Sequence, residues 1–241
     1  MEVDGLAAGY GGLTVLRDVT LRVDGGEVVA VLGPNGAGKS TLLLAIAGIL
    51  PPDAGTIRLF GDDVAGASVQ ARSRRGLGFV PAARGLFPGL TVRENIRVNT
   101  PDREALARLV ELAPMLGGLL DRRVGLLSGG EQQMLALARV LLTGPKMVLI
   151  DEMSMGLAPL VVQSLLPVLR SAAERDGVGI LMVEQHASAA LEVSDRVVVL
   201  DHGRVAHEAP SSVVAAQPEL LAKLYLSHSP DAAASERSAD G

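Results

Sequence analysis

A glycine-rich stretch, GPNGAGKS at positions 33–40, has the clearest chemical meaning in this sequence. It matches the pattern G-x-x-x-x-G-K-[ST], whose backbone N–H groups wrap a chain of phosphates. Gly36 and Gly38 would allow that wrapping, while Lys39 would reach the β- and γ-phosphates. The hydroxyl of Ser40 would ligate Mg²⁺. The alternative is a glycine-rich turn with a surface lysine, but an apolar strand before the loop and an apolar helix after it favour phosphate binding.

A second group of chemical interest is the acidic pair that ends MVLIDE at 147–152. An aspartate at the end of a buried strand can hold Mg²⁺, so Asp151 is a candidate metal ligand. Glu152 beside it could polarise an attacking water. Acidic residues after a strand carry little weight alone, and it is the phosphate-binding loop that gives this pair its significance.

The third group is LSGGEQQ at 127–133. Ser128 and Glu131 have the spacing of a capping box, and the apolar residues that follow repeat at helical spacing until Gly144-Pro145. A well-capped helix is therefore one interpretation. The other is an anion site, because Gly129 and Gly130 would leave N–H groups accessible in the first turn.

The elements that must position these groups alternate in type along the chain. TLLLAIAGIL, directly after the loop, predicts a buried helix that ends at Pro51-Pro52. The runs at 147–151, 178–184 and 196–200 are short and apolar and are separated by helical stretches, as in a parallel sheet covered on both faces. Residues 81–145 change to helical spacing and predict a helical insertion.

Near the N-terminus the pattern favours an antiparallel layer. VTLRV (19–23) and EVVAVL (27–32) flank the turn signal Asp24-Gly25-Gly26, which predicts a hairpin. TIRLF (56–60) predicts a further strand. The polar, aperiodic stretch at 227–241 predicts a disordered tail.

Composition excludes several classes of protein. A formal net charge of −5 argues against a general nucleic-acid binder, because a phosphate-tracking surface is normally basic. The chain has no cysteine, which excludes disulfides, thiol catalysis and cysteine metal sites. The N-terminus lacks the pattern of a signal peptide, and no run reaches the roughly 18 apolar residues of a bilayer span.

GPNGAGKST, LSGGEQQ and the strand ending in Asp-Glu, in this order and spacing, resemble the ATP-binding-cassette (ABC) ATPases. The resemblance implies an α/β fold: a P-loop NTPase core with a mixed sheet, an N-terminal antiparallel β layer and an inserted helical subdomain. The ABC ATPase domain would cover 1–226, with a core at 1–80 and 146–226 and the helical subdomain at 81–145.

In that family two copies close head to tail on ATP, so the resemblance implies a homodimer, or a heterodimer with a paralogous subunit. ATP and Mg²⁺ would be the ligands, and Ser128 and Gly130 would complete the γ-phosphate site of the partner copy. The matching nucleotide-binding positions are Tyr10, Gly33, Pro34, Asn35, Gly36, Ala37, Gly38, Lys39, Ser40, Thr41, Ser128, Gly129, Gly130 and Asp151. Tyr10 would stack on adenine and Thr41 would bind the α-phosphate. Glu152 and Gln185 would be catalytic, and Ser40 and Asp151 would hold the metal.

Within the family, FVPAARGLFPGLTVRENI and DEMSMGLAPLVV look most like the ATPases of branched-chain amino acid importers. That implies integral membrane permease subunits, an extracytoplasmic solute-binding protein and a peripheral place on the cytoplasmic face of the membrane. The alternatives are the ATPase of an exporter and a soluble ATP-gated clamp with weak hydrolysis. A P-loop kinase or GTPase would not need LSGGEQQ.

Several residues depart from the family pattern. The switch position falls at Gln185, and His186 beside it is expected to turn away from the phosphate. Ala82 stands where relatives place Gln or Glu, which predicts slower or less tightly coupled hydrolysis. Met153 occupies the usual proline position, and Pro167 is expected to kink the helix that contains it.

Overall fold

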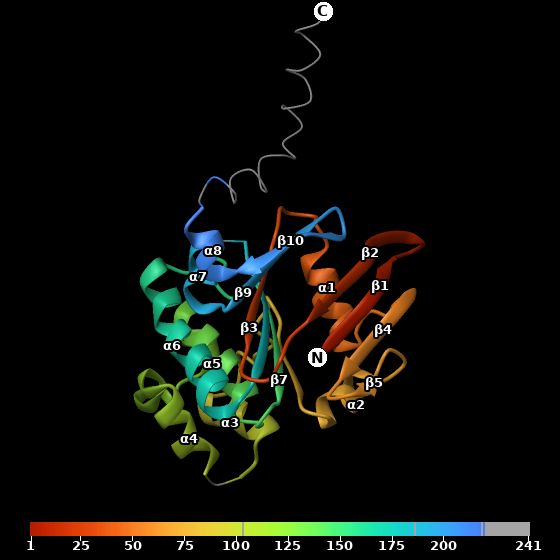
Figure 1. Cartoon of the computed structure of the whole chain (residues 1–241). Coiled ribbons are helices and arrows are strands. Elements are labelled where there is room, and N and C mark those ends of the chain that lie inside the picture. Colours follow the sequence, from red (N-terminus) through yellow and green to blue (C-terminus); the bar gives the residue numbers. More distant parts are fainter. Residues whose placement is uncertain (103, 186, 218, 220–241) are drawn as a thin grey trace, which may run out of the picture.

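A computed structural model of the chain describes residues 1–102, 104–185, 187–217 and 219. Two sheets lie on either side of helix α1 (Lys39–Ala47), and further helices cover the outer face of the larger sheet (Figure 1). This is the α/β architecture with a mixed sheet and an antiparallel sheet that the sequence predicts. His186 and the tail at 227–241 lie outside the described residues.

The smaller sheet is antiparallel and has the order β2-β1-β4-β5. Its strands are β1 (Glu2–Tyr10), β2 (Leu13–Arg22), β4 (Ala54–Leu59) and β5 (Asp62–Asp63). The predicted antiparallel layer and the strand in TIRLF are therefore confirmed. β1 was missing from the sequence interpretation, because register shifts against both neighbouring strands break its alternation of apolar residues.

The hairpin predicted around Asp24-Gly25-Gly26 is wrong. β2 pairs with β1, whereas the next strand, β3 (Val28–Leu32), enters the larger sheet between β8 and β9. All five residues of β3 are buried, while β2 has exposed residues along its whole length between a few buried ones. A strand without a solvated face belongs in a sheet covered on both sides, so the glycine turn joins two sheets rather than two arms of a hairpin.

The larger sheet has the order β10-β9-β3-β8-β7-β6, and only the edge strand β10 is antiparallel to its neighbour. The remaining strands are β6 (Leu77–Val80), β7 (Met147–Asp151), β8 (Gly179–Val183), β9 (Arg196–Asp201) and β10 (Arg204–Pro210). The three apolar runs read as parallel strands are confirmed as β7, β8 and β9.

The two faces of this sheet belong to two separate cores. Along β3, Val28, Ala30 and Leu32 face the outer helices, whereas Val29 and Val31 face α1 and the antiparallel sheet. This alternation follows from the two-residue period of a strand. Helix α1 is buried on nearly every side, as its uniformly apolar sequence predicts.

The other helices follow α1 along the rest of the described chain, and most of them lie outside the larger sheet (Figure 1). They are α2 (Val69–Arg74), α3 (Val92–Asn99), α4 (Ala105–Leu112), the 3₁₀ turns Pro114–Leu119 and Val124–Leu126, α5 (Gly129–Leu141), α6 (Pro159–Asp176), α7 (Ala187–Val193) and α8 (Ser211–Ala215). Helix α6 runs unbroken through Pro167, which lies on its exposed face. Within the described residues, none of the helices has both the length and the apolar character that crossing a bilayer requires.

The end of α1 is closed by an arginine from a distant part of the chain. Arg72 on α2 is 1% exposed, and its guanidinium donates to Ala45 O at 2.8 Å, Ile46 O at 2.7 Å, Ala65 O at 2.9 Å and Ala67 O at 3.1 Å. The cation lies at the negative end of the helix, where the last carbonyls need donors. Arg72 thus fixes the far end of the helix that begins at the phosphate-binding loop.

Replacing Arg72 with Met should reduce the free energy of unfolding by about 3 kcal/mol, because several buried carbonyls lose their donor. Urea titration followed by circular dichroism measures the change. Arg74→Met is the matched control, since Arg74 is exposed on the same helix. Equal stability of the two variants would contradict the capping role.

Candidate functional site

The loop at 33–40 lies at the carboxyl edge of the parallel strands, between the end of β3 and the start of α1. Gly33 has a φ of 152°, and a Cβ there would lie 2.1 Å from the carbonyl oxygen of Leu200. On the other side, a Cβ at Gly36 would meet no atom within 4 Å. The loop is therefore pressed against β9 on one side and open on the other, as a cradle for a ligand requires.

Lys39 is the buried cation of this loop. Its side chain is 5% exposed, and Nζ donates to Gly33 O at 2.8 Å and to Pro34 O at 3.1 Å. Burial lowers the pKa of Lys39, while the carboxylates of Glu152, Asp151 and Glu184 oppose that shift. Within the described chain, none of those carboxylates is within 4.0 Å of the ammonium group. A buried ammonium without a direct carboxylate partner suits an incoming anion.

The hydroxyl of Ser40 donates to Asp151 Oδ1 at 3.0 Å, across 111 residues of sequence. Burial raises the pKa of Asp151 and the hydrogen bond from Ser40 lowers it. Oxygen atoms of hydroxyl and carboxylate groups are the ligands that Mg²⁺ prefers, and Ser40 directly follows Lys39 in the chain. The two side chains predicted to hold the metal are therefore brought together.

The acidic residue after Asp151 has an unusual backbone. Glu152 adopts a φ of 46°, in the left-handed region, and its N–H donates to Val183 O at 3.0 Å. Because β8 lies between β3 and β7, residues that follow β7 and β8 converge on the loop that follows β3. Glu152 and Gln185 are thus brought to the same edge of the sheet as Lys39. Gln185 is exposed there.

The LSGGEQQ segment forms the capping box that its spacing predicts. Ser128 Oγ accepts from Glu131 N at 3.3 Å, and Glu131 Oε2 accepts from Ser128 N at 2.6 Å. Gly130 is buried, and a Cβ on it would lie 2.4 Å from Val161 Cγ1 on α6. This glycine is therefore required for close helix packing, a reason that the sequence interpretation did not supply. In the described structure, no hydrogen bond joins residues 128–130 to the loop at 33–40.

The other predicted nucleotide contacts differ in exposure. Tyr10 ends β1 and is 50% exposed, so its ring is available for stacking. Thr41 is buried in the first turn of α1. Asn35 is exposed, and Ala37 is buried. Met153, directly after Glu152, is buried in the core.

Ala82 leaves the loop after β6 without a polar side chain, but Arg84 two residues later connects it to α5. Arg84 Nε donates to Gln133 Oε1 at 3.0 Å and Arg84 NH1 donates to Gln132 Oε1 at 2.8 Å. A cavity of about 270 Å³ beside this contact is lined by Ala82, Arg84 and Gln132 among others. The sequence interpretation missed Arg84, and only its position in VPAAR pointed to it.

A contact between Glu184 and Ser154 was also missed. Glu184 is 1% exposed, and both of its carboxylate oxygens accept hydrogen bonds from Ser154. The sequence contained one indication of this contact. The apolar run VGILMVE ends in a glutamate, and a buried carboxylate needs hydrogen-bond partners.

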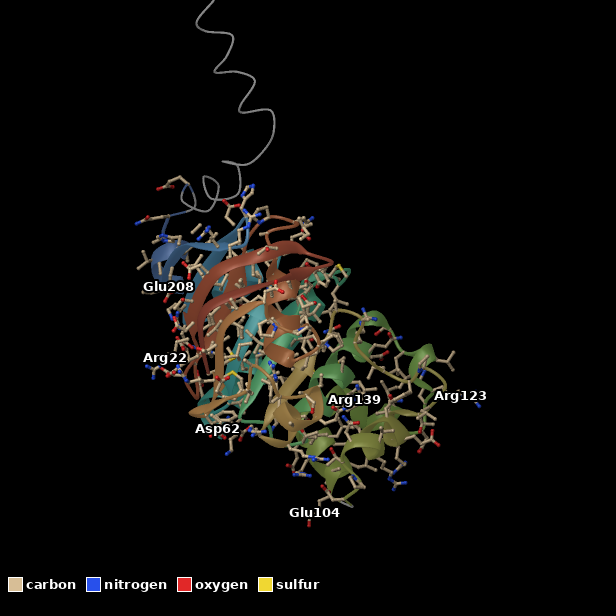
Figure 2. All side chains as sticks on the ribbon, turned by 90° about the vertical axis from the view of Figure 1, so that its right-hand side faces the viewer. Arg22, Asp62, Glu104, Arg123, Arg139 and Glu208 are labelled. Atoms are coloured by element: carbon tan, nitrogen blue, oxygen red, sulfur yellow. The ribbon has the colours of Figure 1, made fainter. Side chains whose placement is uncertain are left out.

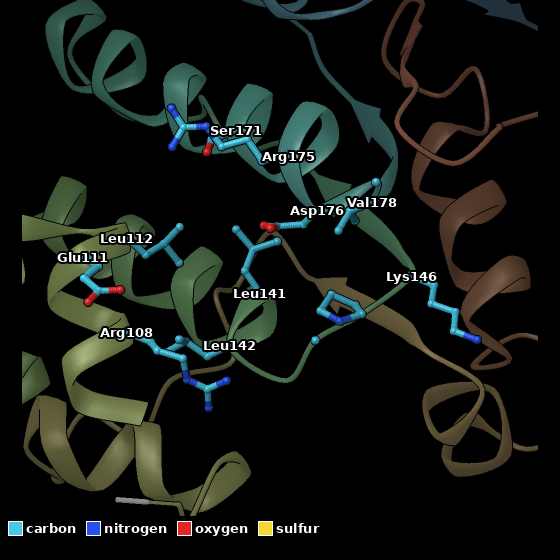
Figure 3. A pocket seen from close by; sticks show the side chains of 13 residues that line it. Arg108, Glu111, Leu112, Leu141, Leu142, Lys146, Ser171, Arg175, Asp176 and Val178 are labelled. Atoms are coloured by element: carbon cyan, nitrogen blue, oxygen red, sulfur yellow. The ribbon is translucent and has the colours of Figure 1, made fainter. Parts of the chain in front are cut away.

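A larger cavity lies at the opposite end of the sheet. It has a volume of about 640 Å³ and is lined by the α4 residues Arg108 and Glu111 and by residues that precede β7 and β8 (Figure 3). Ligands of open α/β sheets bind at the carboxyl ends of the strands, and this cavity lies at the amino ends of β7 and β8. It therefore lies apart from the phosphate-binding loop.

Charged side chains cover the outer surfaces of the molecule. Figure 2 shows Arg22 and Glu208 at the side of the β-sheets and Glu104 and Arg123 at the far end of the helical region. Arg139 lies between these regions, and its NH2 donates to Gly85 O at 2.6 Å. In the described residues, no group of three or more histidine, aspartate and glutamate side chains could hold a metal ion. The Ser40–Asp151 pair is a different donor set.

A glycine-rich loop capped by a buried lysine, a serine bonded to a strand-end aspartate and a central parallel sheet define a P-loop nucleoside triphosphatase. Comparison with known proteins identifies the family. The model of the ABC transporter family matches residues 16–155, more than half of the chain. The chain therefore belongs to the ABC transporter family, as an ATP-binding subunit that hydrolyses ATP.

Two curated relatives span nearly the whole chain. One is the high-affinity branched-chain amino acid transport ATP-binding protein BraG of Pseudomonas aeruginosa, 36% identical over 226 residues, which cover 91% of this chain and 97% of BraG. The other is the lipopolysaccharide export system ATP-binding protein LptB of Escherichia coli, 34% identical over 230 residues, which cover 92% of this chain and 94% of LptB.

Among solved structures, an ATP binding subunit of an ABC transporter matches with a TM-score of 0.79 at 31% identity, covering 94% of this chain and 98% of that one. The predicted family and fold are thereby confirmed. ABC ATPase subunits bind ATP or ADP, dimerise and work with membrane permease components. The relatives include both an importer and an exporter, so the family alone leaves the transported solute open.

Gly130→Ala should lower the free energy of unfolding by about 1 to 3 kcal/mol, because its Cβ would overlap Val161. Val161→Ala alone should cost less, and the double variant should recover part of the loss. A double-mutant cycle with urea denaturation measures this coupling. Strictly additive effects of the two substitutions would contradict the close packing.

Proposed function

We propose that this chain is the ATP-hydrolysing subunit of an importer for branched-chain or related amino acids. The buried ammonium of Lys39 beside the Ser40–Asp151 pair supports the hydrolytic part of the proposal. The similarity to BraG along nearly the whole of both chains supports the importer part.

The proposed mechanism begins with binding. Lys39 lies opposite the γ-phosphate, the N–H groups of 33–40 surround the phosphate chain and Tyr10 stacks on the adenine ring. Ser40 and Asp151 are the residues that would hold Mg²⁺. When bound, that ion supplies positive charge to the β- and γ-phosphate oxygens.

Glu152 is the proposed general base and lies half-buried beside Asp151. Its carboxylate accepts a proton from the attacking water while the water is aligned with the γ-phosphate. Gln185 both accepts from the water and donates to the phosphate, and an amide does so without a dependence on pH. The nucleophile is thus held between groups from two neighbouring strands.

We further propose that the site is completed by a second copy. In the described structure, Ser128, Gly129 and Gly130 make no hydrogen bond to the loop at 33–40 of their own chain. Ser128 is the exposed N-cap of α5, and Gly129 and Gly130 form its first turn. A partner copy facing head to tail would bring its α5 N-terminus to the γ-phosphate. Residues 81–145 would then act as a helical subdomain on a core of 1–80 and 146–226.

The membrane partners follow from the same proposal. Permease subunits would dock near the helical subdomain, a solute-binding protein would deliver the amino acid, and the chain would sit on the cytoplasmic face of the membrane. The similarity to LptB supports a second candidate function, the ATPase of an exporter. Ala82 supports a third candidate, a soluble ATP-gated clamp with weak hydrolysis. Purification of the chain from cells without any associated integral membrane protein would support that clamp.

Glu152→Gln should lower the steady-state rate of ATP hydrolysis by about 100-fold or more, because the attacking water loses its general base, while ATP binding persists. The variant should accumulate as an ATP-bound dimer, which size-exclusion chromatography with and without Mg-ATP measures. Glu174→Gln on the exposed side of α6 is the matched control. Wild-type turnover in Glu152→Gln would remove Glu152 from its proposed role.

Ala82→Glu should raise the rate of ATP hydrolysis, because it returns a carboxylate to the loop after β6. Phosphate release at saturating ATP measures the rate. Ala83→Glu adds the same charge at the exposed neighbouring position and should leave the rate unchanged. An unchanged rate in Ala82→Glu would show that the missing side chain does not limit turnover.

A further inference from the structure

Glu184 is a buried acid immediately after β8 and immediately before Gln185. Its carboxylate accepts from Ser154 N at 3.1 Å through Oε1 and from Ser154 Oγ at 2.5 Å through Oε2. Its own N–H donates to Val31 O at 3.2 Å, so its backbone is fixed to β3. Glu184 therefore connects the strand before the phosphate-binding loop to the segment after β7.

That segment, residues 152–157, is a short series of turns. Met155 N donates to Glu152 O at 3.3 Å, and Leu157 N donates to Ser154 O at 3.2 Å. Glu152 is held by the hydrogen bond from its N–H to Val183 O, and Ser154 is held by the Glu184 carboxylate. Both anchors belong to the end of β8, so 152–154 is fixed to one strand end at two points.

The left-handed backbone at Glu152 makes these anchors necessary. A non-glycine residue in that region costs about 1 to 3 kcal/mol and persists only where its surroundings determine the conformation. Without the second anchor, Glu152 would be free to return to an ordinary backbone conformation. Its carboxylate would then point in another direction relative to Lys39 and Ser40.

We infer that Glu184 is a positioning residue for ATP hydrolysis: by holding Ser154, it fixes the backbone of Glu152 and hence the direction of the Glu152 carboxylate. The inference rests on the proposed role of Glu152 as general base. Gln185 follows Glu184 directly, so the same anchor fixes the spacing between the two groups that contact the attacking water. Loss of the anchor slows the chemical step and leaves ATP binding in place.

Ser154→Ala tests this role, because it removes one of the two hydrogen bonds and keeps every charge. Turnover should fall about 10- to 100-fold, the effect of a small misplacement of a catalytic group, whereas KM and the ATP dissociation constant should change less than about twofold. Ser154→Thr should restore turnover, since it keeps the hydroxyl, and Ser154 lines a cavity of about 350 Å³. The measurements are phosphate release and calorimetric titration with a non-hydrolysable ATP analogue.

Two further variants separate positioning from simple destabilisation. Ser164→Ala on α6 is the matched control, because Ser164 is exposed and, among the described residues, its hydroxyl donates only to Val161 O in its own helix. Glu184→Gln keeps the size of the side chain and its ability to bond Ser154, so it should retain more turnover than Ser154→Ala. If Ser154→Ala hydrolyses ATP as fast as Ser164→Ala does, the inference is overturned. It is also overturned if Ser154→Ala is slow and Ser154→Thr is equally slow.

Failure of the positioning role of Glu184 can be distinguished from failure of the proposed role of Glu152 as general base. If Glu152→Gln is inactive and Ser154→Ala is fully active, Glu152 keeps its role and Glu184 loses its own. If Glu152→Gln turns over ATP at the wild-type rate, the positioning role is overturned together with the general base.

Discussion

The ammonium group of Lys39 is buried against two carbonyl oxygens of its own loop, and much of the fold serves to keep it there. The loop can fold back on this lysine because Gly33 allows contact with β9 and because α1 begins directly at Lys39. Helix α1 is held in turn between two sheets. A buried cation of this kind stabilises a bound anion strongly, since little water competes for the charge.

The order of the parallel strands determines which other groups reach this cation. β8 separates β3 from β7, so acids that are far apart in sequence meet at one edge of the sheet. Asp151 bonds Ser40, Glu152 follows it, and Glu184 closes the next strand. The second half of the molecule contributes the α5 N-terminus, which makes no hydrogen bond to the loop at 33–40 among the described residues of one chain. That separation is the physical reason to expect a dimer.

Much of this arrangement could be predicted from local patterns. β7, β8, β9 and the capping box of α5 were predictable because uniform burial and short-range spacing determine them. β1 was not, because Gly5 at a φ of 59° lies within a register shift that interrupts its alternation. The assignment of β3 to the wrong sheet has a related cause, since a turn signal does not specify which sheet the next strand joins. Arg84, Glu184 and Gly130 act through tertiary contacts that a single sequence does not encode locally.

The closure of α1 by Arg72 also orders events during synthesis. The carbonyl of Ile46 receives its donor from a residue 26 positions further along the chain. When a nascent polypeptide has left the ribosome only as far as β4, the carbonyl oxygen atoms at the C-terminal end of α1 therefore still lack this donor. Helix α1 should gain its closed end in the growing chain only once α2 has emerged and docked, well before Asp151 and β9 are available to the loop.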